Sequence, residues 1–169
     1  MPEFERTSGT SFVGLRGAQA SATLPRNADT KVQNMPQTIT TGYKALVDVA
    51  EREIETIAVE DAIKLHGRDD VVLIDIRDPR ELDRDGRVPG AHHCPRGMLE
   101  FWIDPASPYH KPLFAQDKKY VFFCAGGLRS ALATQTAHRM GLAPVAHIKG
   151  GFGAWKKAGG PVEAVPAKG

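Results

Sequence analysis

Unbroken apolar runs at residues 71–74 (VVLI) and 120–123 (YVFF) constrain the fold more than any other feature of this sequence. A strand that is apolar on both faces must be covered on both faces, as in a parallel sheet. A third strand is expected over residues 144–148, and helical spacing predicts a helix over residues 128–141, between the last two strands. Strands that alternate with helices indicate an α/β fold, in which a parallel sheet is flanked by helices on both faces.

Residues 43–163 are expected to form the folded domain. Apolar residues recur at helical spacing over residues 43–55, and a short apolar piece at residues 57–59 leads into a second helix that ends at Gly67. Residues 1–42 are rich in small and polar side chains without sustained periodicity, which predicts a flexible or disordered tail. Residues 164–169 are expected to form a short C-terminal tail.

Composition narrows the class of protein. With 169 residues, 41% of them hydrophobic, the chain can bury one sizeable core. The 22 basic and 20 acidic residues balance to +2, and no apolar run approaches the roughly 20 residues of a membrane span, so neither nucleic-acid binding nor membrane insertion is expected. Residues 105–169 carry nine basic and two acidic side chains, a surplus that favours an anionic substrate.

Only two cysteines are present, Cys94 and Cys124, which excludes a disulfide-rich scaffold. A cytoplasmic protein with reduced thiols is therefore expected. Organellar import is the alternative, because residues 6–28 contain three arginines and no acidic residue.

The segment after the apolar run at residues 120–123 carries the most distinctive chemistry. It opens with Cys124, and two glycines then allow a tight curve that turns backbone N–H groups inward. The start of the next helix adds partial positive charge, and Arg129 is expected to curl over the loop and bind an oxyanion. These surroundings stabilise a thiolate, so Cys124 is the expected nucleophile rather than an inert buried thiol. The residues expected to bind substrate are Ala125, Gly126, Gly127, Leu128, Arg129 and Ser130, with Ser130 either donating to the thiolate or capping the helix.

Residues 124–130 fit the pattern C-x-x-G-x-R-S and resemble the active-site loop of rhodanese-type sulfurtransferases. Three further segments resemble that family's other signatures in the same order: residues 72–77 with Glu81, residues 86–91 with Arg87 where histidine is usual, and residues 150–161 with Trp155. The resemblance spans about residues 55–163 and implies a single rhodanese domain that transfers a sulfane sulfur through a persulfide on Cys124. It implies an anionic donor such as thiosulfate, a thiol, protein or cyanide acceptor, and no metal or organic cofactor.

Two other functions stay open. Rhodanese-fold phosphatases and arsenate reductases use C-x5-R, whereas four residues, none acidic, separate Cys124 from Arg129 here. A sulfur carrier or binding module for one protein partner is the second alternative. Residues 96–114 could then line the pocket mouth, with packing expected of Leu99 and Phe101 more than of Trp102.

The remaining polar clusters predict structural roles. Residues 92–94 (HHC) are not expected to bind a metal, because neighbouring residues of a strand face opposite sides. Cys94 is expected to be a buried strand residue, and a disulfide between the two cysteines stays open. Asp75, Arg77 and Glu81 follow a strand, and a pair between Arg77 and Glu81 is expected to tie the next loop.

Overall fold

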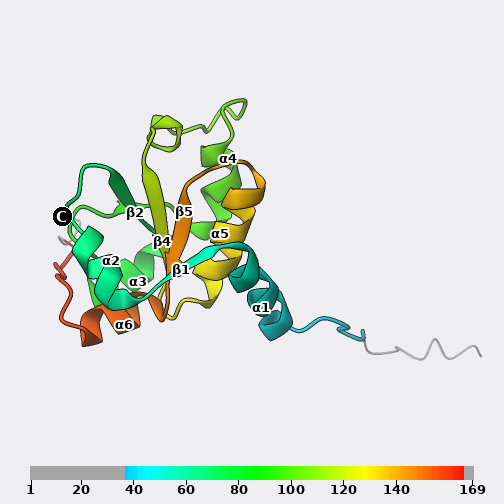
Figure 1. Ribbon diagram of the computed structural model, residues 1–169, viewed down its shortest axis with the longest axis horizontal. Helices are drawn as coiled ribbons and strands as arrows, with labels where there is room; N and C mark the ends of the chain where they lie inside the picture. Colours follow the sequence, from blue (N-terminus) through cyan, green and yellow to red (C-terminus); the bar gives the residue numbers. More distant parts are fainter. Residues whose placement is uncertain (1–36, 166–169) are drawn as a thin grey trace, which may run out of the picture. The chain divides into compact units, whose positions relative to one another are not determined.

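The computed structural model describes residues 37–165, so the expected tails fall largely outside the described residues. Helices and strands alternate along almost the whole of this range (Figure 1). The helices are α1 (Tyr43–Glu53), α2 (Val59–Leu65), α3 (Pro79–Asp85), α4 (Leu99–Ile103), α5 (Leu128–Arg139) and α6 (Gly151–Lys157), with 3-10 turns η1 (Arg96–Met98) and η2 (Pro112–Ala115). The strands are β1 (Glu55–Ile57), β2 (Val71–Asp75), β3 (His92–His93), β4 (Lys119–Phe123) and β5 (Val145–Ile148).

The strands form a five-stranded parallel sheet in the order β1-β5-β4-β2-β3. Its centre is β4, which pairs with β2 from Val71↔Lys119 to Asp75↔Phe123. Four of the five residues in each of these two strands are buried, as expected for strands covered on both faces. The predicted α/β fold is therefore confirmed.

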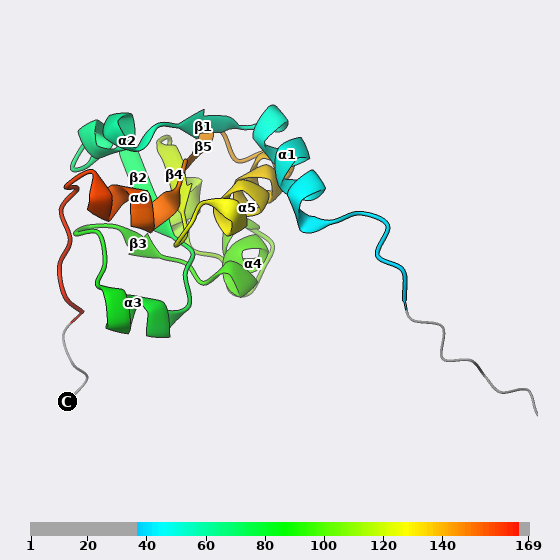
Figure 2. The same cartoon turned by 90° about the horizontal axis from the view of Figure 1, so that it is seen from below.

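Helices cover both faces of the sheet (Figures 1 and 2). On one face α4 and α5 enclose an apolar cluster that contains Phe122, Cys124 and Ala133. On the other face α2 and α6 pack over a second cluster built on Val121 and Trp155. Helix α1 lies against α5, where Val47, Ala50 and Ala131 form a smaller cluster. No helix within residues 37–165 has the length and apolar character needed to cross a membrane.

Two strands depart from the sequence prediction. Glu55 begins β1 at the edge of the sheet instead of ending a helix, because α1 stops at Glu53, and Lys149 N–H binds the carbonyl of Ile57. Strand β3 covers only His92 and His93, so it ends one residue before Cys94, which was expected to lie in it.

Candidate active site

Cys124 lies at the carboxyl end of β4, where the chain turns into α5. In parallel α/β sheets this edge is where ligands bind. The thiol is buried, with 1% of the residue exposed, and its Sγ accepts the N–H of Gly127 at 3.2 Å. The predicted order of strand, cysteine, glycine turn and helix is present, with Gly127 in the left-handed region (φ +94°) just before α5.

Two carbonyls of the cysteine loop (residues 124–130) are held by hydrogen bonds from the first turn of α6. Phe152 N–H donates to the Cys124 carbonyl at 2.7 Å, and Gly153 N–H donates to the Ala125 carbonyl at 2.9 Å. Because the C=O and N–H of a planar trans peptide point in opposite directions, the amides of Ala125 and Gly126 face away from α6. The first turn of α6 thus sets the direction in which the loop amides point.

Two glycines permit this close packing. A side chain at Gly151 (φ +57°) would collide with the Cys124 carbonyl and would reach within 2.9 Å of the Gly127 nitrogen. A side chain at Gly127 would lie 3.0 Å from the Gly150 nitrogen. The sequence shows residues 150–161 as a family-like signature, but it does not show that Gly150 and Gly151 contact the cysteine loop.

Arg129 is anchored beside the loop by Glu81 of α3. Its Nη1 and Nη2 donate to the two carboxylate oxygens of Glu81 at 2.7 and 2.8 Å. These hydrogen bonds lower the pKa of Glu81 to about 2 and raise the pKa of Arg129, to which the neighbouring Cys124 sulfur also contributes. Glu81 is itself fixed because it accepts the Asp78 N–H in the capping box that begins α3. The guanidinium therefore keeps a fixed position near the sulfur, and 45% of its side chain is exposed.

The predicted pair between Arg77 and Glu81 is wrong. Arg77 turns into the core instead and pairs with Asp75, whose Oδ2 is 2.6 Å from Nη2, with both side chains almost fully buried. Its guanidinium also donates to the Gly86 carbonyl and lies 3.9 Å from the centre of the Phe152 ring. The Asp75–Arg77 pair thus packs against α6 through Phe152.

Ser130 does not serve the sulfur, contrary to one of the two roles predicted for it, and it does not cap α5 either, because Gly127 is the N-cap residue. Its hydroxyl donates to the Gly127 carbonyl at 3.0 Å and lies 3.4 Å from Nδ1 of His147. The side chain is fully buried, since position 130 faces the sheet one turn into α5. Sequence reasoning missed His147, although a histidine inside the apolar strand β5 was a usable signal.

Cys94 and the neighbouring histidines form no second reactive centre. Cys94 follows β3 instead of lying in it, and burial raises its pKa to about 12. Both cysteines are free, so no disulfide blocks Cys124. His93 binds the Arg77 carbonyl while His92 is exposed, and within the described part of the chain no three potential metal ligands cluster.

The aromatic residues of segment 96–114 pack differently from the prediction. Leu99 is buried as expected, but Phe101 is exposed, and Trp102 packs partly against the core. Helical spacing explains this difference, because Leu99 and Ile103 share the inner face of α4 and Phe101 falls on the outer face.

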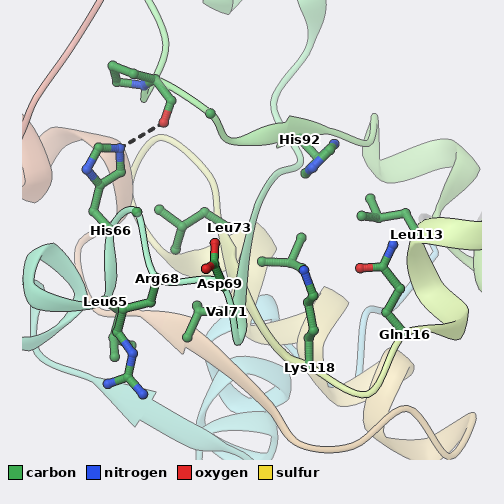
Figure 3. A pocket seen from close by; sticks show the side chains of 14 residues that line it. Leu65, His66, Arg68, Asp69, Val71, Leu73, His92, Leu113, Gln116 and Lys118 are labelled. Carbon is green, nitrogen blue, oxygen red and sulfur yellow. Dashed lines mark hydrogen bonds between the residues drawn. The ribbon is translucent and has the colours of Figure 1, made fainter.

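A cavity of about 390 Å³ lies elsewhere in the fold (Figure 3). It is lined by the start of β2, the turn at residues 65–69 and Lys118, and His66 binds the Pro89 carbonyl at its rim. Cys124 follows the end of β4, whereas this cavity lies at the beginning of the neighbouring strand β2. It is therefore separate from the cysteine loop.

Comparisons with known proteins identify relatives of this chain. A sulfurtransferase of Allochromatium vinosum is 30% identical over 60% of this chain and 86% of its own length. An uncharacterized protein of Synechocystis is 32% identical over 63% of this chain, which spans about half (54%) of that protein.

Two solved structures extend the comparison. A Rhodopseudomonas palustris protein, described as of unknown function and a possible tyrosine phosphatase, is 67% identical, with a TM-score of 0.75 over 76% of this chain and 99% of that one. The polysulfide-sulfur transferase homodimer of Wolinella succinogenes is 32% identical, with a TM-score of 0.56 over 73% of this chain and 88% of that one. Residues 58–158 match the family model described as the rhodanese-like domain. The chain therefore belongs to the rhodanese-like domain family.

Proposed function

We propose that this protein is a sulfurtransferase that carries a sulfane sulfur on Cys124, within a catalytic domain formed by residues 43–163. The observation that carries the proposal is the surroundings of the Cys124 sulfur. One loop amide lies 3.2 Å from Sγ, two neighbouring loop carbonyls are bound by α6, and Arg129 is held nearby. Inward amides and a fixed guanidinium stabilise negative charge on a thiolate and on a persulfide.

The reaction has two displacement steps at one sulfur. The Cys124 thiolate attacks the outer sulfur of thiosulfate, the S–S bond of the donor breaks, and sulfite leaves with the electron pair. The product is a Cys124 persulfide anion, with the loop amides and Arg129 around its terminal sulfur. An acceptor thiolate, or cyanide in an assay, then attacks that terminal sulfur and releases the Cys124 thiolate. Another persulfide donor fits the same scheme, with a thiolate as the leaving group.

The acceptor class is a thiol, either small or carried on a partner protein. A thiol nucleophile needs a reducing compartment, and the cytoplasm is the proposed location. Sulfur transfer by the Allochromatium and Wolinella proteins, as their names state it, supports the reaction class.

A phosphatase is the second candidate, since the Rhodopseudomonas structure is described in those terms. The loop holds no carboxylic acid that could protonate a leaving alkoxide, a step worth about 10²–10⁴-fold in rate. Sulfur transfer therefore fits the loop better than phosphate ester hydrolysis.

Intact-mass measurement tests the proposal. The reduced protein and a Cys124→Ser variant are treated with thiosulfate and desalted, and their intact masses are measured. Glutathione persulfide is tested as a second sulfur donor, and para-nitrophenyl phosphate as a phosphatase substrate. We expect the wild type alone to gain the mass of one sulfur, and cyanide to remove it as thiocyanate. Hydrolysis of the phosphate ester without sulfur uptake from either donor would overturn the proposal in favour of a phosphatase.

A further inference from the structure

A buried polar cluster lies behind the cysteine loop and centres on His147 of β5. The residue is 1% exposed. Its Nε2 lies 3.0 Å from Oγ1 of Thr56, its cross-strand neighbour on β1, and its Nδ1 lies 3.4 Å from Oγ of Ser130 on α5. Both ring nitrogens of a fully buried imidazole are thus within hydrogen-bond distance of hydroxyl groups.

The partners of the cluster determine where the ring proton lies. The Ser130 hydroxyl donates its proton to the Gly127 carbonyl at 3.0 Å, so its oxygen faces His147 as an acceptor. With the Ser130 proton on the Gly127 carbonyl, the tautomer that satisfies this contact carries its proton on Nδ1 of His147 and donates toward Ser130. Nε2 is then the acceptor for the Thr56 hydroxyl, which is free to donate.

The same cluster holds a peptide unit of the cysteine loop. The Gly127 carbonyl accepts both the Ser130 hydroxyl and the Ala131 N–H, which turns the Leu128 N–H of that peptide in the opposite direction. The N–H of Gly127 itself reaches the Cys124 sulfur. The peptide plane after Gly127 is therefore held by Ser130 and Ala131, and the plane before it is held by the Cys124 sulfur.

Few charges face the ring. Glu51 of α1 places Oε1 3.9 Å from Nε2, and Lys149 lies just beyond β5. Burial lowers the pKa of His147 more than Glu51 and the Gly127 carbonyl raise it, and Lys149 lowers it further. The ring is therefore neutral near pH 7, in agreement with the hydrogen-bond pattern.

We infer that His147 is a positioning residue, which acts through Ser130 and Gly127 to hold the loop amides around Cys124. The inference rests on the proposed role of Cys124. It also gives α1 and β1 a role, because Glu51 of α1 and Thr56 of β1 both lie near Nε2 of the ring.

The first test needs no variant. Nitrogen-15 NMR of the histidine rings in the wild-type protein at pH 7 reports the tautomer of His147. We expect a neutral ring that carries its proton on Nδ1. A ring protonated on Nε2 alone would overturn the inference.

The second test measures alkylation of Cys124 by iodoacetamide across pH in two variants. His147→Leu removes the ring donor, whereas His147→Asn keeps an amide donor near the place of Nδ1. We expect His147→Leu to slow alkylation below its pH midpoint, by up to about tenfold for an upward shift of that midpoint by one pH unit. His147→Asn should stay within about twofold of the wild type, and equal rates in all three proteins would overturn the inference.

A matched control separates this effect from general destabilisation. Thr136→Val removes a hydroxyl on α5 that binds only the Leu132 carbonyl of its own helix, and it should leave the alkylation profile unchanged. If His147→Leu does not fold, the wild-type ring spectrum still tests the inference. If alkylation depends on His147 but the protein takes up no sulfur, the proposed function is refuted and the inference about His147 stands. Sulfur uptake with alkylation indifferent to His147 would refute the inference alone.

Discussion

Gly151→Ala is expected to be the most damaging small substitution near the active site. Gly151 has φ +57°, and a β-carbon there would overlap the Cys124 carbonyl and crowd the Gly127 nitrogen. The left-handed conformation costs an alanine about 1–2 kcal/mol. Forcing an atom into packed backbone costs about 1–3 kcal/mol more. The free energy of unfolding should therefore fall by about 2–5 kcal/mol.

Gly159→Ala is the matched control, because Gly159 has φ +78° but nothing lies within 4 Å of the position of its β-carbon. It should lose only the conformational part, about 1–2 kcal/mol. The entropy that alanine removes from the unfolded chain is the same in both variants and cancels. The difference between the two variants then measures the collision with the cysteine loop alone.

Urea unfolding followed by tryptophan fluorescence measures this difference. With a typical slope of about 2 kcal/mol per molar urea, the two midpoints should differ by about 1 M. Cys124 alkylation should change in Gly151→Ala and not in Gly159→Ala, because only the first position touches the loop. Equal midpoints and equal alkylation rates would show that the loop does not depend on close packing against Gly151.

Two further predictions concern ion pairs. Arg77→Met leaves Asp75 charged and buried, so the free energy of unfolding should drop by about 3–5 kcal/mol. The double variant with Asp75→Leu should regain much of this lost stability. A drop of less than about 1 kcal/mol in Arg77→Met would contradict the argument. Because the pKa of Glu81 is lowered to about 2 from 4.5, its pairing with Arg129 stabilises the protein above pH 4.5, and this contribution is lost as pH falls toward 2. In Glu81→Gln the free energy of unfolding should fall less on acidification than in the wild type, by about 1 kcal/mol. The difference is small because Arg129 is partly exposed. Glu60→Gln, at an exposed carboxylate of α2, should leave the acid-side profile as in the wild type, and an unchanged profile in Glu81→Gln would count against the pairing.

The parts of the fold that were predictable are those encoded in long local patterns. The runs at residues 71–74 and 120–123 needed cover on both faces and became central strands. Cys124, its glycine turn and the helix after it were readable because each residue constrains the backbone locally. Strand β1 has three residues, too few for a periodicity to reveal it, and the end of the two-residue strand β3 could not be placed from the sequence.

Side-chain partners were less predictable than elements. The sequence allows Arg77 to pair with Glu81, but the fold buries Arg77 against Asp75 and brings Glu81 to Arg129, far along the chain. The sequence allowed Ser130 to face the sulfur or to cap a helix. In the fold its hydroxyl instead contacts the Gly127 carbonyl and His147 of the neighbouring strand β5. These choices depend on which helix lies over which strand.

The contact between α6 and the cysteine loop has a consequence for the order of assembly. Cys124 leaves the ribosome well before Phe152 and Gly153, whose amides bind the carbonyls of Cys124 and Ala125. Until that late helix docks, the loop has no partner for those carbonyls and no fixed direction for its amides. A chain interrupted before Gly151 would contain β2, β4 and the thiol, yet the nucleophile would lack the contacts that α6 provides. The surroundings that activate the thiol are thus completed only when the last helix docks.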